Sequence, residues 1–270
     1  MQQGIAFIGG GNMASAIIGG LLKQGWPVSH IDVVEPFDEA RSKLSSEFGI
    51  SAQAQAGSFL TRADLVVWAV KPQTFRDAAA QTQAHTHAAL HLSVAAGIRS
   101  DTIAQWLGSE RVVRAMPNTP ALIGKGITAL FARAAVSEPD KALVNQVLGS
   151  TGELMWVDAE DHIDAVTALS GSGPAYMFYF MEAMREAGTG MGLDPAQAYR
   201  LAVATFIGAG ELAKASPESP ETLRQRVTSK GGTTFAALTS MESDGVKASF
   251  IAAMRAAQQR AKELGDEFGA

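Results

Sequence analysis

A glycine-rich segment near the N-terminus constrains the fold of this chain more than any other feature. After the apolar run Ile5-Ala-Phe-Ile8, the chain continues Gly9-Gly10-Gly11-Asn12-Met13-Ala14 and enters a helical pattern. A strand, the pattern G-x-G-x-x-A and a helix together form the fingerprint of a dinucleotide-binding βαβ unit. Its first glycine permits a tight turn, its second lets the backbone approach a pyrophosphate, and Ala14 allows close packing of helix on strand. The helix start at Asn12 and Met13 then offers unpaired N–H groups to phosphates.

The pattern that follows predicts a Rossmann-type domain over residues 1–159. Short apolar runs alternate with helical patterns, which is typical of an α/β fold with a mostly parallel sheet. The runs are nearly continuous in apolar residues, as expected for strands covered on both faces. The predicted strands are residues 5–8, 31–34, 65–70, 92–95, 112–113, 127–131 and 153–157.

Residues 160–270 predict a second, all-α domain. The strand pattern stops after Val157, and helical patterns cover residues 161–169, 174–191, 194–215, 221–228, 234–243 and 246–267. The helix at 175–191 is apolar over most of its circumference, more than one small domain readily covers. We therefore expect this domain to form the interface of a homo-oligomer.

Composition excludes several classes of function. A net charge of −5 without a block of like charges lacks the basic surface of a nucleic-acid-binding protein. The chain has no cysteine, which rules out disulfides, thiolate nucleophiles and zinc–sulfur sites. No basic leader precedes a long apolar stretch, and no apolar run approaches the ~20 residues that span a bilayer. We expect a cytoplasmic protein with neither membrane nor nucleic acid as partner.

The histidines do not predict a metal site. His85, His87 and His91 lie close together in the sequence, but no helix face or single strand aligns all three. No carboxylate lies between them. A bound metal is therefore not expected.

Glu35 is the predicted contact to the adenosine ribose. It ends the second strand, 24 residues beyond Gly11, where a carboxylate usually accepts hydrogen bonds from the ribose hydroxyls. A carboxylate there repels a 2′-phosphate and favours NADH, whereas Arg41 is close enough in sequence to reach such a phosphate. A solvated surface glutamate is the alternative, so the choice between NADH and NADPH stays open.

Two further loops are predicted at the same edge of the sheet. Ala69-Val70-Lys71-Pro72 leaves the third strand at its carboxyl end, and Met116-Pro117-Asn118-Thr119-Pro120 closes a later strand. Open α/β sheets bind ligands at this edge. We expect cofactor contacts from Ala69, Val70, Lys71, Pro72, Met116 and Asn118. Lys71 could instead contact substrate or face solvent.

The segment Val227–Thr234 resembles an anion-binding nest. Its sequence is Val-Thr-Ser-Lys-Gly-Gly-Thr-Thr, directly ahead of a predicted helix. Backbone N–H groups and hydroxyls at a helix N-terminus bind anions. Composition alone favours the other interpretation, a turn between helices with a threonine cap.

Five motifs in order resemble the pyrroline-5-carboxylate reductase family over essentially the whole chain. They are Phe7–Met13, Ala69–Pro72, Met116–Pro120, Ser170-Gly-Ser-Gly-Pro-Ala-Tyr176 and Thr228-Ser-Lys-Gly-Gly-Thr-Thr234. Thr228–Thr234 is the most specific of them. Many relatives have proline where Lys230 stands, and small polar or Asn-Arg pairs are common in place of Glu35-Pro36.

The resemblance implies the reduction of 1-pyrroline-5-carboxylate to L-proline with NADPH or NADH. It implies that Thr234 hydrogen-bonds the ring nitrogen and assists its protonation. Ser229 and the N–H groups of Gly231, Gly232 and Thr233 would bind the substrate carboxylate, so Ser229 and Thr234 form the implied catalytic pair. It further implies a homodimer, or a multiple of dimers, with a site shared between subunits.

Two alternatives are compatible with the sequence. The same two-domain plan serves reductases of other imines, ketones or β-hydroxy acids, although these are not expected to carry Thr228–Thr234 together with Met116–Pro120. A protein that binds NAD(P)H without turnover is the other alternative, since a fold alone does not confer function.

Overall fold

The computed structural model describes residues 3–269 of the chain. By its contacts the chain divides into two units, of which the second is Gly173–Ala256. The first unit runs up to Ser172 and takes up the chain again from Ala257. The predicted boundary between the two domains, at residues 159 and 160, stays a prediction.

A seven-stranded sheet forms the centre of the first unit, in the order β2-β1-β3-β4-β5-β6-β7. All neighbours are parallel except β5 and β6. The exception arises because a short loop joins β5 to β6, and a parallel pair would need a crossover of a dozen residues or more. The strands are β1 (Ile5–Ile8), β2 (Ile31–Val34), β3 (Leu65–Trp68), β4 (Leu90–Ser93), β5 (Val112–Met116), β6 (Gly126–Ala132) and β7 (Gly152–Trp156).

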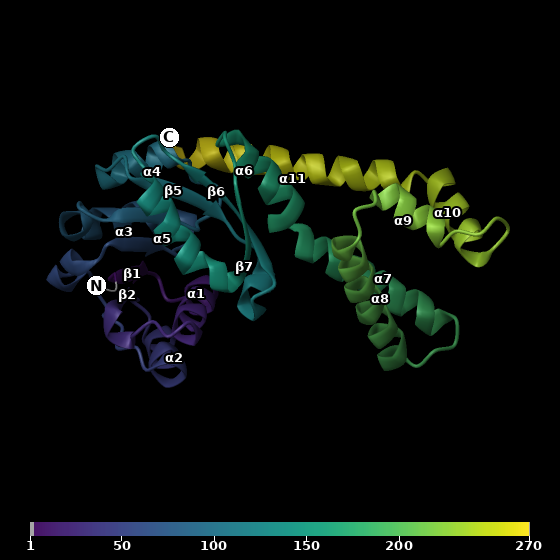
Figure 1. Cartoon of the computed structure of the whole chain (residues 1–270), viewed down its shortest axis with the longest axis horizontal. Helices are drawn as coiled ribbons and strands as arrows, with labels where there is room; N and C mark the ends of the chain where they lie inside the picture. Colours follow the sequence, from purple (N-terminus) through teal and green to yellow (C-terminus); the bar gives the residue numbers. More distant parts are fainter. Residues whose placement is uncertain (1–2, 270) are drawn as a thin grey trace. The chain divides into compact units, whose positions relative to one another are not determined.

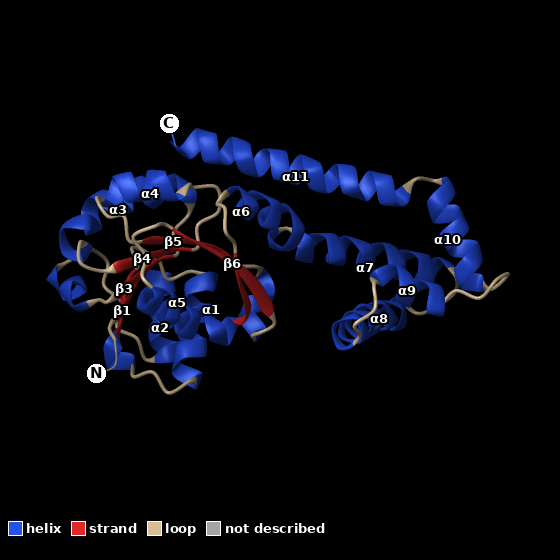
Figure 2. Cartoon of the chain, turned by 45° about the horizontal axis from the view of Figure 1, so that its top comes forward, coloured by secondary structure: helices blue, strands red, loops and turns tan. Residues whose placement is uncertain are grey.

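Helices cover both faces of this sheet (Figure 2). One face carries α1 (Asn12–Lys23), α2 (Asp38–Phe48) and α5 (Glu138–Leu148), and the other carries α3 (Pro72–Thr86) and α4 (Ser100–Leu107). Each face has its own apolar core, as the continuous apolar strands predicted. Short 3₁₀ helices lie at Val28–His30, Ser58–Arg62, Thr119–Ile123 and Gly149–Thr151.

The register of the central strands aligns their carboxyl ends. Ile8 at the end of β1 pairs with Val34 of β2 on one side and with Trp68 of β3 on the other. The loops that leave these three strands therefore begin side by side. This edge is where an open α/β sheet binds its ligand.

Asn118 ties the loop after β5 to two other segments. Its Oδ1 accepts a hydrogen bond from the Ile127 N–H at 3.0 Å, and its Nδ2 donates one to the Ser170 carbonyl at 3.1 Å. Ser170 lies in a π-helix, Thr167–Gly171, that follows α6 (Asp161–Val166). Single π-helical turns are rare and occur frequently at functional sites.

The second unit consists of helices. They are α7 (Gly173–Gly190), α8 (Pro195–Ala215), α9 (Pro220–Arg226), α10 (Thr233–Ser243) and the first part of α11 (Val246–Gly269), as shown in Figure 1. Phe250 lies 5.6 Å from both Tyr176 and Phe180 between ring centroids. Large apolar side chains remain exposed along α7 and α8, among them Phe178, Tyr179, Leu201, Ile207 and Leu212. In residues 3–269, no helix is both long enough and apolar enough to cross a membrane.

The end of α11 packs within the first unit. A Cβ on Gly97 would lie 2.9 Å from the Cβ of Leu264, and Phe268 packs against the core beneath α3 and α4. Arg99 adds an ion pair to Asp266 at 2.7 Å. Helical periodicity predicted this helix but not the partner of its last turns.

His91 is a buried titratable group in β4. The Trp68 Nε1–H donates to His91 Nδ1 at 3.2 Å, while His91 Nε2 has no hydrogen-bond partner among the described residues. Burial, with a smaller effect of the Arg111 charge, lowers the pKa of His91 from 6.5 to about 4. The His91 imidazole therefore becomes protonated at a lower pH in the folded protein than in the unfolded chain.

We predict that Asn118→Ala lowers the free energy of unfolding by about 2–3 kcal/mol, because one Ile127 N–H and one Ser170 carbonyl lose their partner. Urea denaturation followed by circular dichroism measures the change. Asn145→Ala is the matched control, since Asn145 is exposed and accepts a single bond from Trp156. Equal losses in both variants would contradict the bridging role of Asn118.

We predict that His91 makes the protein less stable as the pH falls from about 6.5 to about 4, where the unfolded state binds the proton and the folded state does not. The shift corresponds to about 3 kcal/mol at 1.36 kcal/mol per pKa unit. Denaturation of His91→Gln at several pH values should show a shallower decline. His162→Gln, which removes an exposed histidine, should keep the original decline.

Candidate active site

The glycine-rich loop lies between the ends of two strands. The Gly9 N–H donates to the Val34 carbonyl of β2 at 2.8 Å, and Gly9 has a φ of +95°. A Cβ on Gly9 would lie 2.5 Å from the Ala69 carbonyl oxygen beyond β3. Because only glycine combines this backbone angle with such a close approach, the tight turn predicted at Gly9 is present.

Open space and unpaired donors lie at the start of α1. No atom lies within 4 Å of the place where a Cβ on Gly11 would stand. Gly11 caps α1 without a side-chain hydrogen bond, and the first turn, which includes Asn12 and Met13, holds no acidic residue. The first N–H groups of the helix therefore face a free volume with partial positive charge. This arrangement fits the diphosphate of a dinucleotide.

Glu35 lies at the loop, but its carboxylate is largely buried. Its exposed fraction is 5%. Oε2 accepts from the Gly10 N–H at 2.7 Å, and Oε1 accepts from the Phe37 N–H at 2.9 Å. The sequence predicted the position of Glu35 but not that it ties the glycine loop to the start of α2.

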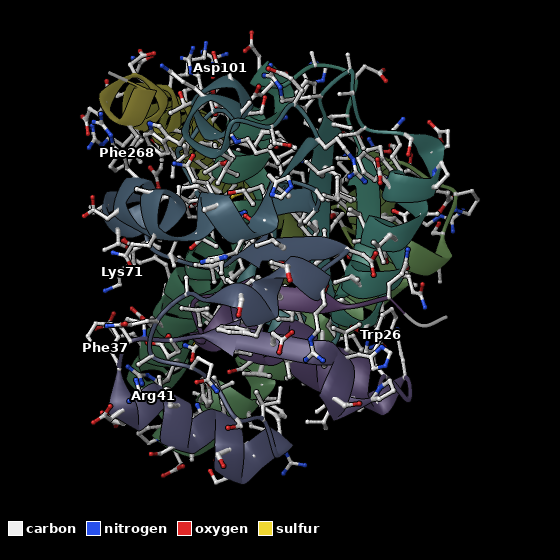
Figure 3. All side chains as sticks on the ribbon, turned by 90° about the vertical axis from the view of Figure 1, so that its left-hand side faces the viewer. Trp26, Phe37, Arg41, Lys71, Asp101 and Phe268 are labelled. Atoms are coloured by element: carbon white, nitrogen blue, oxygen red, sulfur yellow. The ribbon has the colours of Figure 1, made fainter. Side chains whose placement is uncertain are left out.

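The segment after β3 lies beside the glycine loop. The Ala69 N–H donates to the Ile8 carbonyl at 2.8 Å, and Val70 is partly buried. Lys71 caps α3, which begins at Pro72, and its side chain is exposed. In Figure 3, Lys71 lies on the same side of the first unit as Phe37 and Arg41. The four residues of this motif thus flank the edge where β1, β2 and β3 end.

Met116 and Asn118 contact the π-helix. The Met116 Cε lies 2.5 Å from the place where a Cβ on Gly171 would stand, so Gly171 leaves room for this side chain. Both amide atoms of Asn118 are bonded, to Ile127 and Ser170. The sequence predicted that Asn118 contacts the cofactor, but it did not predict the hydrogen bond from Asn118 to the Ser170 carbonyl. The motif Ser170–Tyr176 was visible, but helical periodicity does not reveal a π-helical turn.

The candidate substrate segment lies in the second unit. α10 begins at Thr233, and its N-cap is Gly232, which has no side chain to accept a hydrogen bond from the first N–H groups of the helix. The Gly232 N–H donates to the Ser229 carbonyl at 3.0 Å, and Gly231 has a φ of +75°. A Cβ on Gly232 would lie 2.6 Å from the Ser229 Oγ. The threonine cap considered as an alternative is therefore absent.

Three exposed hydroxyls surround this helix start. Those of Ser229, Thr233 and Thr234 have no hydrogen-bond partner within residues 3–269, whereas Thr228 donates to the Arg224 carbonyl at 2.7 Å. The first N–H groups of α10 also lack intrahelical partners. Hydroxyls and N–H groups of this kind can hold a carboxylate.

The histidine group does not assemble. His91 lies in β4 and is bonded to Trp68, while His85 lies in α3 and His87 follows this helix. Across the described part of the chain, no three side chains of histidine, aspartate or glutamate are grouped to hold a metal ion.

Two family models match the two parts of the chain. The model described as "NADP oxidoreductase coenzyme F420-dependent" matches residues 4–97. The model described as "Pyrroline-5-carboxylate reductase dimerisation" matches residues 160–264. The second match covers the helical region in which an oligomer interface was predicted.

Similar proteins cover the whole chain. The pyrroline-5-carboxylate reductase of Pseudomonas aeruginosa is 44% identical over 267 residues, which is 98% of each chain. That of Escherichia coli is 37% identical over 98% of this chain and 99% of its own.

Solved structures agree. The enzyme of Coxiella burnetii aligns with a TM-score of 0.90 and 38% identity, covering 98% of this chain and 99% of that one. The Plasmodium falciparum enzyme, solved with NADP bound, aligns with a TM-score of 0.88 and 27% identity over 98% of both chains. This chain belongs to the pyrroline-5-carboxylate reductase family.

Proposed function

We propose that this protein reduces 1-pyrroline-5-carboxylate to L-proline with NADPH or NADH. The observation that carries the proposal is the start of α10, where unpaired N–H groups meet three unbonded hydroxyls on the motif most specific to the family. The sequence similarity to pyrroline-5-carboxylate reductases, 44% identity over 98% of the chain, supports this reaction over the reduction of another imine or a β-hydroxy acid.

The glycine loop and its neighbours would hold the dinucleotide. Gly9 permits the tight turn, Gly11 leaves room for the diphosphate, and the N–H groups at Asn12 and Met13 donate to it. Glu35 lies at the ribose end, and Ala69, Val70, Lys71, Pro72, Met116 and Asn118 line the edge beyond. The bound nicotinamide supplies the hydride.

The start of α10 would bind and orient the substrate. The Ser229 hydroxyl and the N–H groups of Gly231 and Thr233 bind the carboxylate, helped by the helix dipole. Gly232 would contribute mainly by its missing side chain, because its N–H already bonds the Ser229 carbonyl.

Thr234 would hold the proton on the imine nitrogen. A protonated imine is already a good electrophile, so the protein needs mainly to align the ring, a task that requires neither a cysteine nor a metal. The hydroxyl of Thr234 has no partner within the described residues, which leaves it available for this bond.

We further propose a homodimer in the cytoplasm. The match to a dimerisation model supports assembly of like chains. The exposed apolar side chains of α7 and α8 are the kind of surface that such an interface covers.

The direct test follows the loss of reduced-nicotinamide absorbance with racemic 1-pyrroline-5-carboxylate, in parallel with NADH and NADPH. Proline should form in proportion to the cofactor oxidised. Folded protein that binds the cofactor but leaves this substrate unchanged would contradict the proposed reaction.

We predict that Thr234→Ala lowers kcat by at least about 10²-fold, because the imine nitrogen loses its hydrogen-bonding hydroxyl. The dissociation constant of NADH, measured by fluorescence titration, should not change. Thr239→Ala is the matched control on the same helix, since the Thr239 hydroxyl is bonded to the Phe235 carbonyl at 2.9 Å. Loss of NADH affinity in Thr234→Ala would show that Thr234 serves the cofactor instead.

We predict that one of two glycine substitutions lowers stability and that the other lowers NADH affinity. Gly9→Ala should lower the free energy of unfolding by about 1–3 kcal/mol, because of its positive φ and the nearby Ala69 carbonyl. Gly11→Val should keep its stability and lose NADH affinity, because the new side chain enters the open volume ahead of α1. Thermal melts and NADH titrations separate the two effects. Normal NADH binding by Gly11→Val would place the diphosphate elsewhere.

A further inference from the structure

We propose that Asp38, through its ion pair with Arg41, makes this protein select NADH over NADPH. The proposal rests on the proposed function, since it concerns the dinucleotide that the glycine loop would hold. It adds a specificity-determining residue that the glycine fingerprint does not contain.

Residues 35–41 lie where the adenosine ribose is expected. The ribose of a bound dinucleotide lies beyond the end of β2, next to the glycine loop. Here the loop is bonded to that strand end through Gly9 and Val34 and to Glu35 through Gly10. Figure 3 shows Phe37 and Arg41 close together on this side of the unit. Arg41 is the basic side chain that β2 and the first turn of α2 bring to this place.

The guanidinium of Arg41 already donates hydrogen bonds to other groups of the protein. Its Nη1 donates to the carbonyl oxygens of Glu35, at 2.9 Å, and Pro36, at 2.8 Å. Its Nη2 donates to the Asp38 carboxylate. These bonds hold the side chain at 23% exposure, whereas the Asp38 side chain is 91% exposed. Arg41 therefore supports the turn between β2 and α2, and Asp38 neutralises its charge.

This arrangement penalises a 2′-phosphate. To pair with Arg41, the phosphate must displace Asp38 from Nη2 or share the guanidinium with it. It must also approach the carboxylates of Glu35 and Asp38, which carry the same sign of charge. The two hydroxyls of the NADH ribose carry no charge and can donate to a carboxylate, so they meet neither cost. Selection thus depends on Asp38 as well as on Glu35.

The test measures binding of NADH and NADPH to the full-length protein by fluorescence titration in the absence of substrate. The wild type should bind NADH more tightly. Asp38→Ala should shift the ratio of dissociation constants toward NADPH by about tenfold, because a hydrogen bond to a charged group becomes available to the phosphate. A thermal melt verifies that the exposed substitution leaves the protein folded.

Two variants isolate the ion pair. Glu39→Ala removes the same charge from an exposed position in the same helix turn and should change the ratio by no more than about twofold. Arg41→Ala in the Asp38→Ala background should abolish the gain, because the phosphate loses the group that it was to bind.

The outcomes are distinct. A wild type that prefers NADPH, an unchanged ratio in Asp38→Ala, or an equal shift in Glu39→Ala would each overturn the proposal. Absence of binding by either cofactor to folded wild-type protein would instead overturn the proposed function. Normal binding of both cofactors without reduction of 1-pyrroline-5-carboxylate would leave the role of Asp38 intact and refute only the substrate.

Discussion

The fit of the glycine loop between the ends of β2 and β3 is the constraint on which the candidate cofactor site depends. Gly9 bonds the Val34 carbonyl and has no room for a side chain beside the Ala69 carbonyl. The Gly9 bond to Val34 and the Ala69 bond to Ile8 continue the pairing of β1 with its two neighbours beyond the strand ends, and open space lies at Gly11 ahead of α1. A dinucleotide can meet the helix N-terminus only because the backbone approaches so closely here.

Two polar side chains at the carboxyl ends of strands hold backbone segments in place. Glu35 joins Gly10 to Phe37, and Asn118 joins Ile127 to Ser170. A buried carboxylate or a partly buried amide whose bonds are satisfied makes a loop rigid, and an unsatisfied one would cost stability. Both residues follow strands at the carboxyl edge of the sheet, where the cofactor contacts are proposed.

The start of α1 and the start of α10 share one feature that favours the binding of anions. α1 and α10 each begin at a glycine cap without a side-chain hydrogen bond. A serine or aspartate cap would satisfy the first N–H groups and weaken the attraction for an anion. Glycine leaves these groups available for the proposed ligands, the diphosphate at α1 and the substrate carboxylate at α10.

The sequence by itself determined the element types, the glycine turn and the order of the motifs, because these depend on local periodicity and backbone freedom. The predicted strands and helices differ from the observed ones by a few residues at their ends, and the family resemblance is confirmed. Tertiary structure decided what lies far apart in the chain: the antiparallel β6, the packing of Phe268 against a distant core, and the link between Asn118 and Ser170. It also decided that Glu35 turns inward and that Asp38 occupies Arg41. Such choices depend on which donors and acceptors meet in space, and periodicity carries no information about that.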